Sequence, residues 1–95
     1  MSRKTVPFNR SGIERLPDDK PVVYRIQTEG GKNNYTGVAQ RGRVQDRLAE
    51  HLPGSKDFVP GATVVIEQAR SIAEAREREQ RIIVRSQPKY NEQGK

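Results

Sequence analysis

The chain of 95 residues contains no cysteine, no tryptophan and a single histidine. The absence of cysteine excludes disulfide bonds, a thiolate nucleophile and zinc sites with cysteine ligands. One histidine cannot supply a multi-histidine metal site. No apolar run approaches the roughly 18 residues of a membrane span, and the first residues lack the apolar stretch of a signal peptide. We therefore expect a cytoplasmic protein that makes no contact with a membrane.

Apolar residues are also scarce, because hydrophobic and charged residues each make up 32% of the chain. A chain of this length folds as one small domain with a single modest core. Lysine and arginine number 18 against 12 acidic residues, which gives a formal net charge of +6. Such a charge favours an acidic partner, and nucleic acid is the commonest partner of a small basic domain. A basic structural or protein-interaction subunit without chemistry is the alternative.

The charge and apolar patterns divide the chain into three parts. Residues 1–20 are basic and predict an N-terminal arm that folds back onto the domain through Phe8, Ile13 and Leu16. Residues 21–91 predict the folded domain, and residues 92–95 a C-terminal tail.

Within the domain, residues 21–27 and 34–38 read as strands around a Gly-Gly turn, which is a hairpin signal. A short helix is expected over 43–52, where Pro53 and Gly54 end it, and Phe58 is the expected anchor of the loop 53–61. Residues 62–67 are rich in β-branched side chains and predict a third strand. Ser71 and Glu74 form a capping box, so a second helix is expected from there to about residue 85. The order β-β-α-β-α predicts an α+β fold with a three-stranded antiparallel sheet flanked by helices.

The hairpin carries two tyrosines, Tyr24 and Tyr35, one on each predicted strand. A connecting loop with an even number of residues would place both on one face, directly opposite or diagonally adjacent. Two phenol groups within reach of each other, on strands that also carry Arg25, suggest part of a site.

The first helix has an apolar stripe and, one position earlier, a cationic stripe that contains Arg47 and His51. These two side chains are therefore expected near the boundary between helix and sheet, where they could reach the hairpin. The alternative is an ordinary solvated basic face.

The second helix carries Glu79 at the centre of an apolar stripe. A carboxylate in such a place must be paired, protonated or bound to a cation, because an isolated buried charge is very costly. The alternative to a functional role is a buried ion pair with Arg25 or Arg47.

These residues occur in a recognisable order. Val22-Val-Tyr24, followed after ten residues by Tyr35-Thr-Gly37, resembles the paired tripeptides of the GIY-YIG nucleases. The resemblance continues over residues 21–91, with the arginine and the histidine of the first helix, the glutamate of the second helix and Asn91. The first tripeptide lacks its glycine and the second its isoleucine, which concerns local packing more than chemistry.

The resemblance implies a Mg2+-dependent (or Mn2+-dependent) endonuclease that hydrolyses phosphodiester bonds in DNA with a single metal ion on Glu79. In this reading Tyr24 deprotonates or orients the attacking water, while Tyr35 and His51 shape its hydrogen bonds. Arg47 holds the scissile phosphate. Gly37 and Asn91 have structural roles, and the residues expected to bind nucleic acid are Arg25, Arg41, Arg43 and Lys89.

Two questions stay open in the sequence. The first is whether catalysis is retained, since a nucleic-acid-binding module that kept the fold and lost activity has the same pattern. The second is the substrate: aromatic residues make up 5% of the chain, too few for a platform that stacks several bases. RNA is nevertheless an alternative to DNA, because backbone recognition needs no aromatics. Target choice would come from the arm, the loop 53–61, a dimer or a partner protein.

Overall fold

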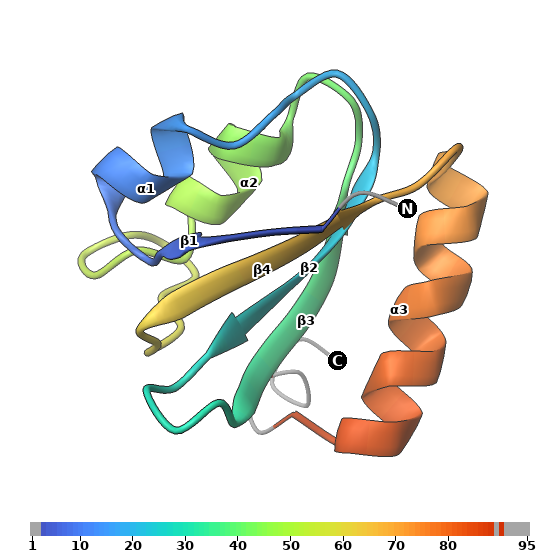
Figure 1. Cartoon of the computed structure of the whole chain (residues 1–95). Coiled ribbons are helices and arrows are strands. Elements are labelled where there is room, and N and C mark those ends of the chain that lie inside the picture. Colours follow the sequence, from blue (N-terminus) through green and yellow to red (C-terminus); the bar gives the residue numbers. More distant parts are fainter. Residues whose placement is uncertain (1–2, 89, 91–95) are drawn as a thin grey trace.

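The structure is a computed structural model that describes residues 3–88 and residue 90. It confirms an α+β fold with an antiparallel sheet between helices (Figure 1). The elements in chain order are β1 (Arg3–Pro7), α1 (Arg10–Glu14), β2 (Val22–Gln27), β3 (Asn33–Ala39), α2 (Val44–Ala49), β4 (Thr63–Gln68) and α3 (Ile72–Ser86). No helix in this part of the chain has the length and hydrophobicity needed to cross a lipid bilayer.

The sheet has four strands in the order β1-β4-β2-β3, so the prediction of three strands is wrong. The additional strand, β1, comes from the basic N-terminal residues and pairs antiparallel with β4, with Val6 opposite Val64. An edge strand buries little, and Val6 is the single buried residue of β1. A single inward-facing apolar side chain gives almost no alternating pattern, which is why the sequence does not reveal this strand.

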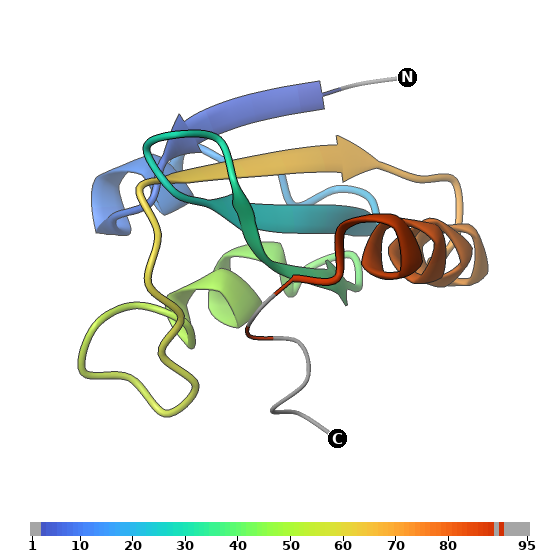
Figure 2. The same ribbon diagram turned by 90° about the horizontal axis from the view of Figure 1, so that it is seen from below.

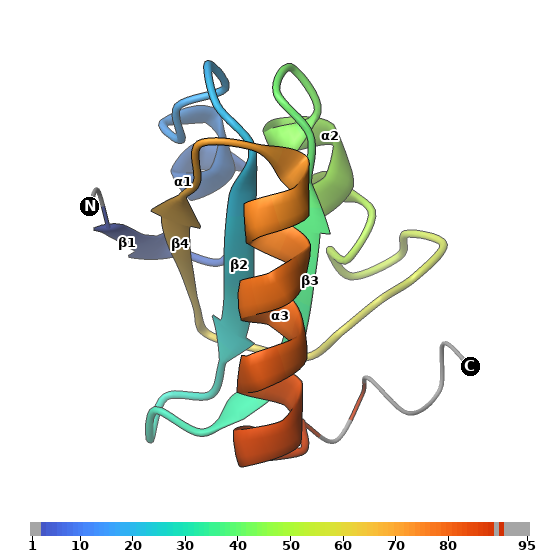
Figure 3. The ribbon, with the colours of Figure 1, turned by 90° about the vertical axis from the view of Figure 1, so that its right-hand side faces the viewer.

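The helices form layers on both faces of the sheet. Helices α1 and α2 cover one face, while α3 runs across the other face along β2 and β3 (Figure 3). The core lies under α1 and α2, where side chains from all four strands meet the apolar sides of both helices. Its residues include Val6, Ile13, Leu16, Val22, Tyr24, Ile26, Val44, Leu48, Val64 and Ile66.

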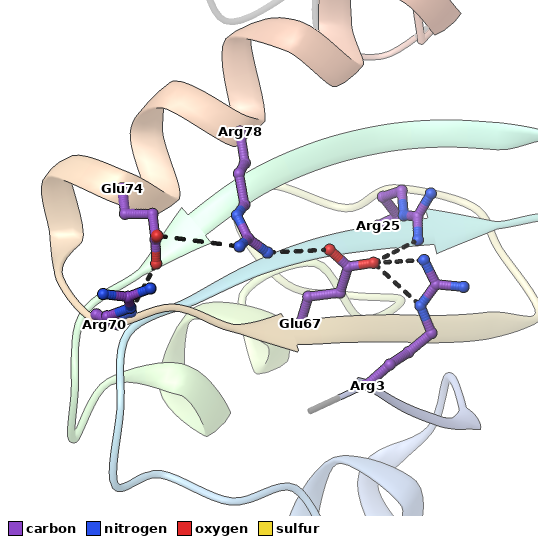
Figure 4. A network of polar contacts seen from close by, with 6 residues as sticks. All are labelled: Arg3, Arg25, Glu67, Arg70, Glu74 and Arg78. Atoms are coloured by element: carbon purple, nitrogen blue, oxygen red, sulfur yellow. Dashed lines mark hydrogen bonds and ion pairs between the residues drawn. The ribbon is translucent and has the colours of Figure 1, made fainter. Parts of the chain in front are cut away.

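The face under α3 contains a network of ion pairs centred on Glu67 of β4 (Figure 4). Its carboxylate accepts a hydrogen bond from Nε of Arg3 at 3.0 Å. Arg25 of β2 lies 3.6 Å away and Arg78 of α3 3.5 Å away. Glu67 therefore links three elements to β4, two of them strands and one the covering helix.

The hairpin between β2 and β3 closes through a turn at Thr28–Lys32, where the N–H of Thr28 donates to the Lys32 carbonyl at 2.9 Å. Gly31 has φ +88 in this turn, a conformation that glycine adopts without steric cost. The connection has an odd number of residues, because Gln27 pairs with Asn33, but a bulge at Ile26/Gln27 shifts the register by one. Beyond the bulge the strands therefore pair as they would after an even loop, with Tyr24 and Tyr35 on the same face.

The long loop after α2 is held by Val59, which is 4% exposed, whereas Phe58 is 47% exposed. The prediction that Phe58 anchors this loop is wrong by one position. Figure 2 shows the loop beside α2, on the side of the sheet away from β1.

Candidate functional site

Tyr24 and Tyr35 lie on the same face of the hairpin, as predicted. Tyr24 pairs with Gly37 and Tyr35 pairs with Ile26, so the two tyrosines are diagonal neighbours. Their ring centroids are 6.1 Å apart. Tyr24 is completely buried beneath α2, whereas Tyr35 is partly exposed at the outer strand of the sheet.

Gly37 leaves the space that the two phenol rings occupy. A Cβ atom at this position would lie 2.7 Å from the Tyr24 hydroxyl oxygen and 3.0 Å from a ring carbon of Tyr35. Real Cβ atoms do not approach other atoms so closely in a packed interior. The glycine of the second tripeptide therefore has a packing role directly beside both tyrosines.

His51 completes a cluster of three rings. It follows the C-terminal end of α2, and its ring centroid lies 4.7 Å from that of Tyr35 and 5.8 Å from that of Tyr24. Its Nε2 lies 2.9 Å from the Tyr24 hydroxyl oxygen, and its Nδ1 lies 2.8 Å from the carbonyl oxygen of Asp57. The structure thus brings together three residues that are distant in the sequence.

These two contacts assign the tautomer of His51. A carbonyl oxygen can only accept, so Nδ1 carries the proton, and in a neutral imidazole Nε2 then accepts the hydroxyl proton of Tyr24. Burial lowers the pKa of His51 and so keeps the ring neutral near pH 7. His51 is therefore a proton acceptor already aimed at Tyr24.

Both tyrosines are held as neutral phenols. Burial is the main cause that raises the pKa of Tyr24, and the pKa of Tyr35 is raised for the same reason. The positive charge of Arg47 opposes both shifts, and hydrogen bonding with Tyr24 also favours the Tyr35 phenolate. Arg47 thus favours both phenolates, but burial outweighs its effect.

Arg47 lies at the mouth of the ring cluster and borders two cavities. One cavity, of about 350 Å³, is lined by Tyr35, His51, the loop residues 56–59 and Tyr90. The other, of about 330 Å³, contains Arg43 and Arg76. The Arg47 guanidinium is 3.5 Å from Glu50, with both side chains well exposed. Such a pair is weak, so Arg47 is available to an anion.

Glu79 is half-buried on α3 and lies close enough to act electrostatically on both tyrosines. Burial raises its pKa, against the opposing charges of Arg76 and Arg47. Over residues 3–88 and 90, no ion pair joins Glu79 to a cation. Arg25 pairs with Glu67 and Arg47 with Glu50, so the alternative of a buried Glu79 ion pair with either arginine is not realised.

The other predicted residues are dispersed. Arg25 lies on the α3 face of the sheet, behind the tyrosines, and Arg41 borders a separate cavity with Lys20 and Arg70. Arg43 lies beside Arg47. Lys89 and Asn91 lie outside the described residues.

Three further residues near the site stand in no motif that the sequence makes evident. They are Arg76, which lies three residues before Glu79 on the same helical side, and the cavity residues Lys56 and Tyr90. The spacing to Glu79 is a usable signal for Arg76. Lys56 and Tyr90 lie outside the helices and strands, and no local sequence pattern predicts how these segments of the chain come to line the cavity.

Known structures resemble this arrangement. A crystal structure of the GIY-YIG N-terminal endonuclease domain of UvrC from Thermotoga maritima, a point mutant bound to its catalytic divalent cation, matches with 25% identity and a TM-score of 0.65. The match covers 85% of this chain and 91% of that one. The same domain bound to magnesium matches with 24% identity and a TM-score of 0.66, over 85% and 92% of the two chains.

By sequence, neither a protein-family model nor a curated protein matches the chain. The similarity in structure nevertheless extends over nearly the whole domain, and the neighbours are nucleases that hold a divalent cation. This similarity supports a metal-dependent nuclease. The paired strands with Tyr24 and Tyr35, and the fold that carries them, place the chain in the GIY-YIG nuclease superfamily.

Proposed function

We propose that this protein is a Mg2+-dependent endonuclease that hydrolyses phosphodiester bonds in DNA with one metal ion. The observation that carries the proposal is the hydrogen bond between the Tyr24 hydroxyl and Nε2 of His51. His51 also lines the cavity that Arg47 borders. If this cluster served packing alone, apolar side chains would be expected in its place, because buried polar groups cost free energy unless every one is hydrogen-bonded.

Glu79 is the residue that would hold the metal. It is a half-buried carboxylate without a cationic partner in the described chain, and a divalent cation would compensate its burial. No group of three or more histidine and acidic side chains lies together among the described residues. Mg2+, with Mn2+ as substitute, fits because it commonly binds through one or two carboxylates together with substrate phosphates. When bound, such a cation supplies Lewis acidity to the phosphate.

The ring cluster supplies the route for the proton of the attacking water. As the water oxygen bonds to phosphorus and the leaving P–O bond breaks, the water proton passes to the Tyr35 hydroxyl at the cavity wall. Tyr35 passes its own proton to Tyr24, and Tyr24 passes its proton to Nε2 of His51. The leaving oxygen takes a proton from solvent. This relay needs neutral phenols and a neutral imidazole, which are the states that burial favours here.

Arg47 binds the scissile phosphate in this proposal. Its planar guanidinium can bind two phosphate oxygens at once and meets the negative charge that grows in the transition state. Glu50, its partner without substrate, is released at little cost because the pair is exposed.

Nicking of supercoiled plasmid at low salt tests the proposal, with Mg2+ or with EDTA. We expect cutting that requires the metal, with loss of at least about a hundredfold in Glu79→Gln because one ligand of the ion is weakened. Glu77→Gln is the matched control, since Glu77 is an exposed neighbour on α3 that pairs with Arg81.

DNA binding in EDTA, measured alongside, separates the alternatives. Binding without cutting of plasmid or branched DNA by a folded protein would favour the inactive nucleic-acid-binding module. Absence of binding to DNA and RNA at moderate salt would favour a structural or protein-interaction subunit. One site of this size is expected to cut one strand per event, so a double-strand break would need a dimer, a partner or two encounters.

A further inference from the structure

Phe58 is an exposed aromatic side chain at the rim of the proposed active site. It is one of two large hydrophobic residues in the described chain that are exposed, the other being Val84 on the outer side of α3. Phe58 lines the cavity that also contains Tyr35, Arg47 and His51. Phe58 thus offers an accessible aromatic surface next to the polar residues of this cavity.

The backbone on both sides of Phe58 is fixed to the end of α2. The N–H of Asp57 donates to the Glu50 carbonyl at 3.0 Å, and the N–H of Val59 donates to the His51 carbonyl at 3.0 Å. The Asp57 carbonyl accepts the Nδ1 proton of His51, and the Val59 side chain is buried in the core. Phe58 is therefore exposed on a backbone held from both sides.

The residues around Phe58 indicate which kind of ligand would bind against its ring. Lys56 and Arg47 line the same cavity as Phe58, together with the acidic Asp57, so the ring shares this cavity with two cations. A nucleotide presents a flat base and a phosphate together, and base stacking on an aromatic ring is the usual way in which proteins bind unpaired bases. The volume of about 350 Å³ lies at the lower end of small-ligand cavities.

We propose that Phe58 stacks on the base next to the scissile phosphate, with Lys56 binding the phosphate that follows. In an intact duplex each base is already stacked on both faces, so this base must be unpaired or turned out of the helix. The inference rests on the proposed nuclease function and deepens it: the preferred substrate carries an unpaired nucleotide at the cleavage position. Phe58 is then a residue that determines specificity.

Fluorescence of 2-aminopurine tests this stacking in EDTA, where no cleavage occurs. The probe is placed as an unpaired nucleotide in an otherwise duplex oligonucleotide, and in a fully paired control of the same sequence. We expect wild type to quench the unpaired probe and bind that DNA more tightly than the duplex. Phe58→Ala should lose the quenching and about 5- to 150-fold in affinity for the unpaired DNA, the range for one base–aromatic stack.

Phe58→Trp should keep both properties, and Val84→Ala, which removes the other exposed apolar side chain, should behave as wild type. If Phe58→Ala binds and quenches as wild type does while plasmid is still nicked, the stacking inference is overturned and the nuclease proposal stands. If wild type binds neither oligonucleotide, both are overturned.

Discussion

The hydroxyl oxygen of Tyr24 and Nε2 of His51 lie 2.9 Å apart in the core, on segments separated by 27 positions in the chain. The contact is directional, because the Asp57 carbonyl fixes the proton on the opposite nitrogen of the ring. A strand and the end of a helix are thereby joined through the chemistry of the site and not through packing alone.

Replacing Tyr24 with phenylalanine removes the middle of the proposed proton relay. We expect kcat to fall by about 10²- to 10⁴-fold, the usual contribution of positioned proton transfer, with little change in KM. Leaving Nε2 of His51 without its partner should lower the free energy of unfolding by about 1–3 kcal/mol. Steady-state kinetics with Mg2+ and chemical denaturation would measure the two effects. An unchanged kcat would exclude Tyr24 from the relay.

The protonation of His51 can be observed directly, because it is the only histidine in the chain. Burial lowers its pKa below the ordinary 6.5, so NMR titration of the ring should give a midpoint below that value. Since the unfolded chain binds this proton more readily, stability should decrease as pH falls through and below 6.5. Cleavage should decrease in the same direction as the ring becomes protonated. A midpoint at or above 6.5 would contradict the buried neutral acceptor.

Gly37 should tolerate no side chain. In Gly37→Ala the Cβ atom would meet the hydroxyl of Tyr24 at 2.7 Å, so the rings must shift. Overpacking of this kind costs about 1–3 kcal/mol, and the displaced phenols should also lower kcat. The control is Gly30→Ala in the hairpin turn, where the nearest atom to the new Cβ is the Thr28 hydroxyl oxygen at 3.9 Å. Thermal denaturation of both variants would measure the difference.

The network around Glu67 should make the fold sensitive to acid. Burial alone would raise the pKa of Glu67, but the hydrogen bond from Arg3 and the charges of Arg25 and Arg78 outweigh it and lower the pKa. The resulting stability is therefore present above about pH 4.5, the ordinary value for glutamate, and is lost as pH falls through the lower folded value.

Glu67→Gln tests this network by chemical denaturation at neutral and acidic pH. We expect a loss of about 1–2 kcal/mol near pH 7, the range for charge-assisted hydrogen bonds that are partly exposed. The difference from wild type should shrink in acid, where wild type has also lost the charge. A difference independent of pH would show that the network acts by shape and not by charge.

The second cavity at Arg47 predicts a contact for the DNA backbone. Arg43 and Arg76 line it together with Arg47, so each of the first two is expected to contact a phosphate. Arg43→Gln and Arg76→Gln should each weaken binding to all DNA sequences and reduce the salt slope of log K by about 1. Binding titrations at several salt concentrations in EDTA would measure this slope. Arg85→Gln, on the last turn of α3, is the control cation outside the residues that line this cavity.

The sequence predicts those parts of the fold in which a local pattern reflects burial. The alternating strands and the capping box at Ser71 appear at nearly their expected places. The strand β1 has one inward residue and so no pattern, and the burial of Val59 instead of Phe58 depends on how a long loop crosses the core. The pairing rules place the two tyrosines on one face for an even loop, whereas here a bulge gives the same arrangement with an odd loop. The contact of His51 with Asp57 depends on the long loop after α2.

The bulge at Ile26/Gln27 separates the geometry of the site from the length of the turn. A hairpin without it would transmit every single-residue change in the turn to the strand, and would move Tyr35 to the α3 face of the sheet. Loss of the bulge compensates for a change of the turn by an odd number of residues, so that Tyr35 stays on its face of the sheet. A shortened variant with a two-residue Asn-Gly turn should therefore be built without the bulge, whereas insertions of two residues should leave it in place.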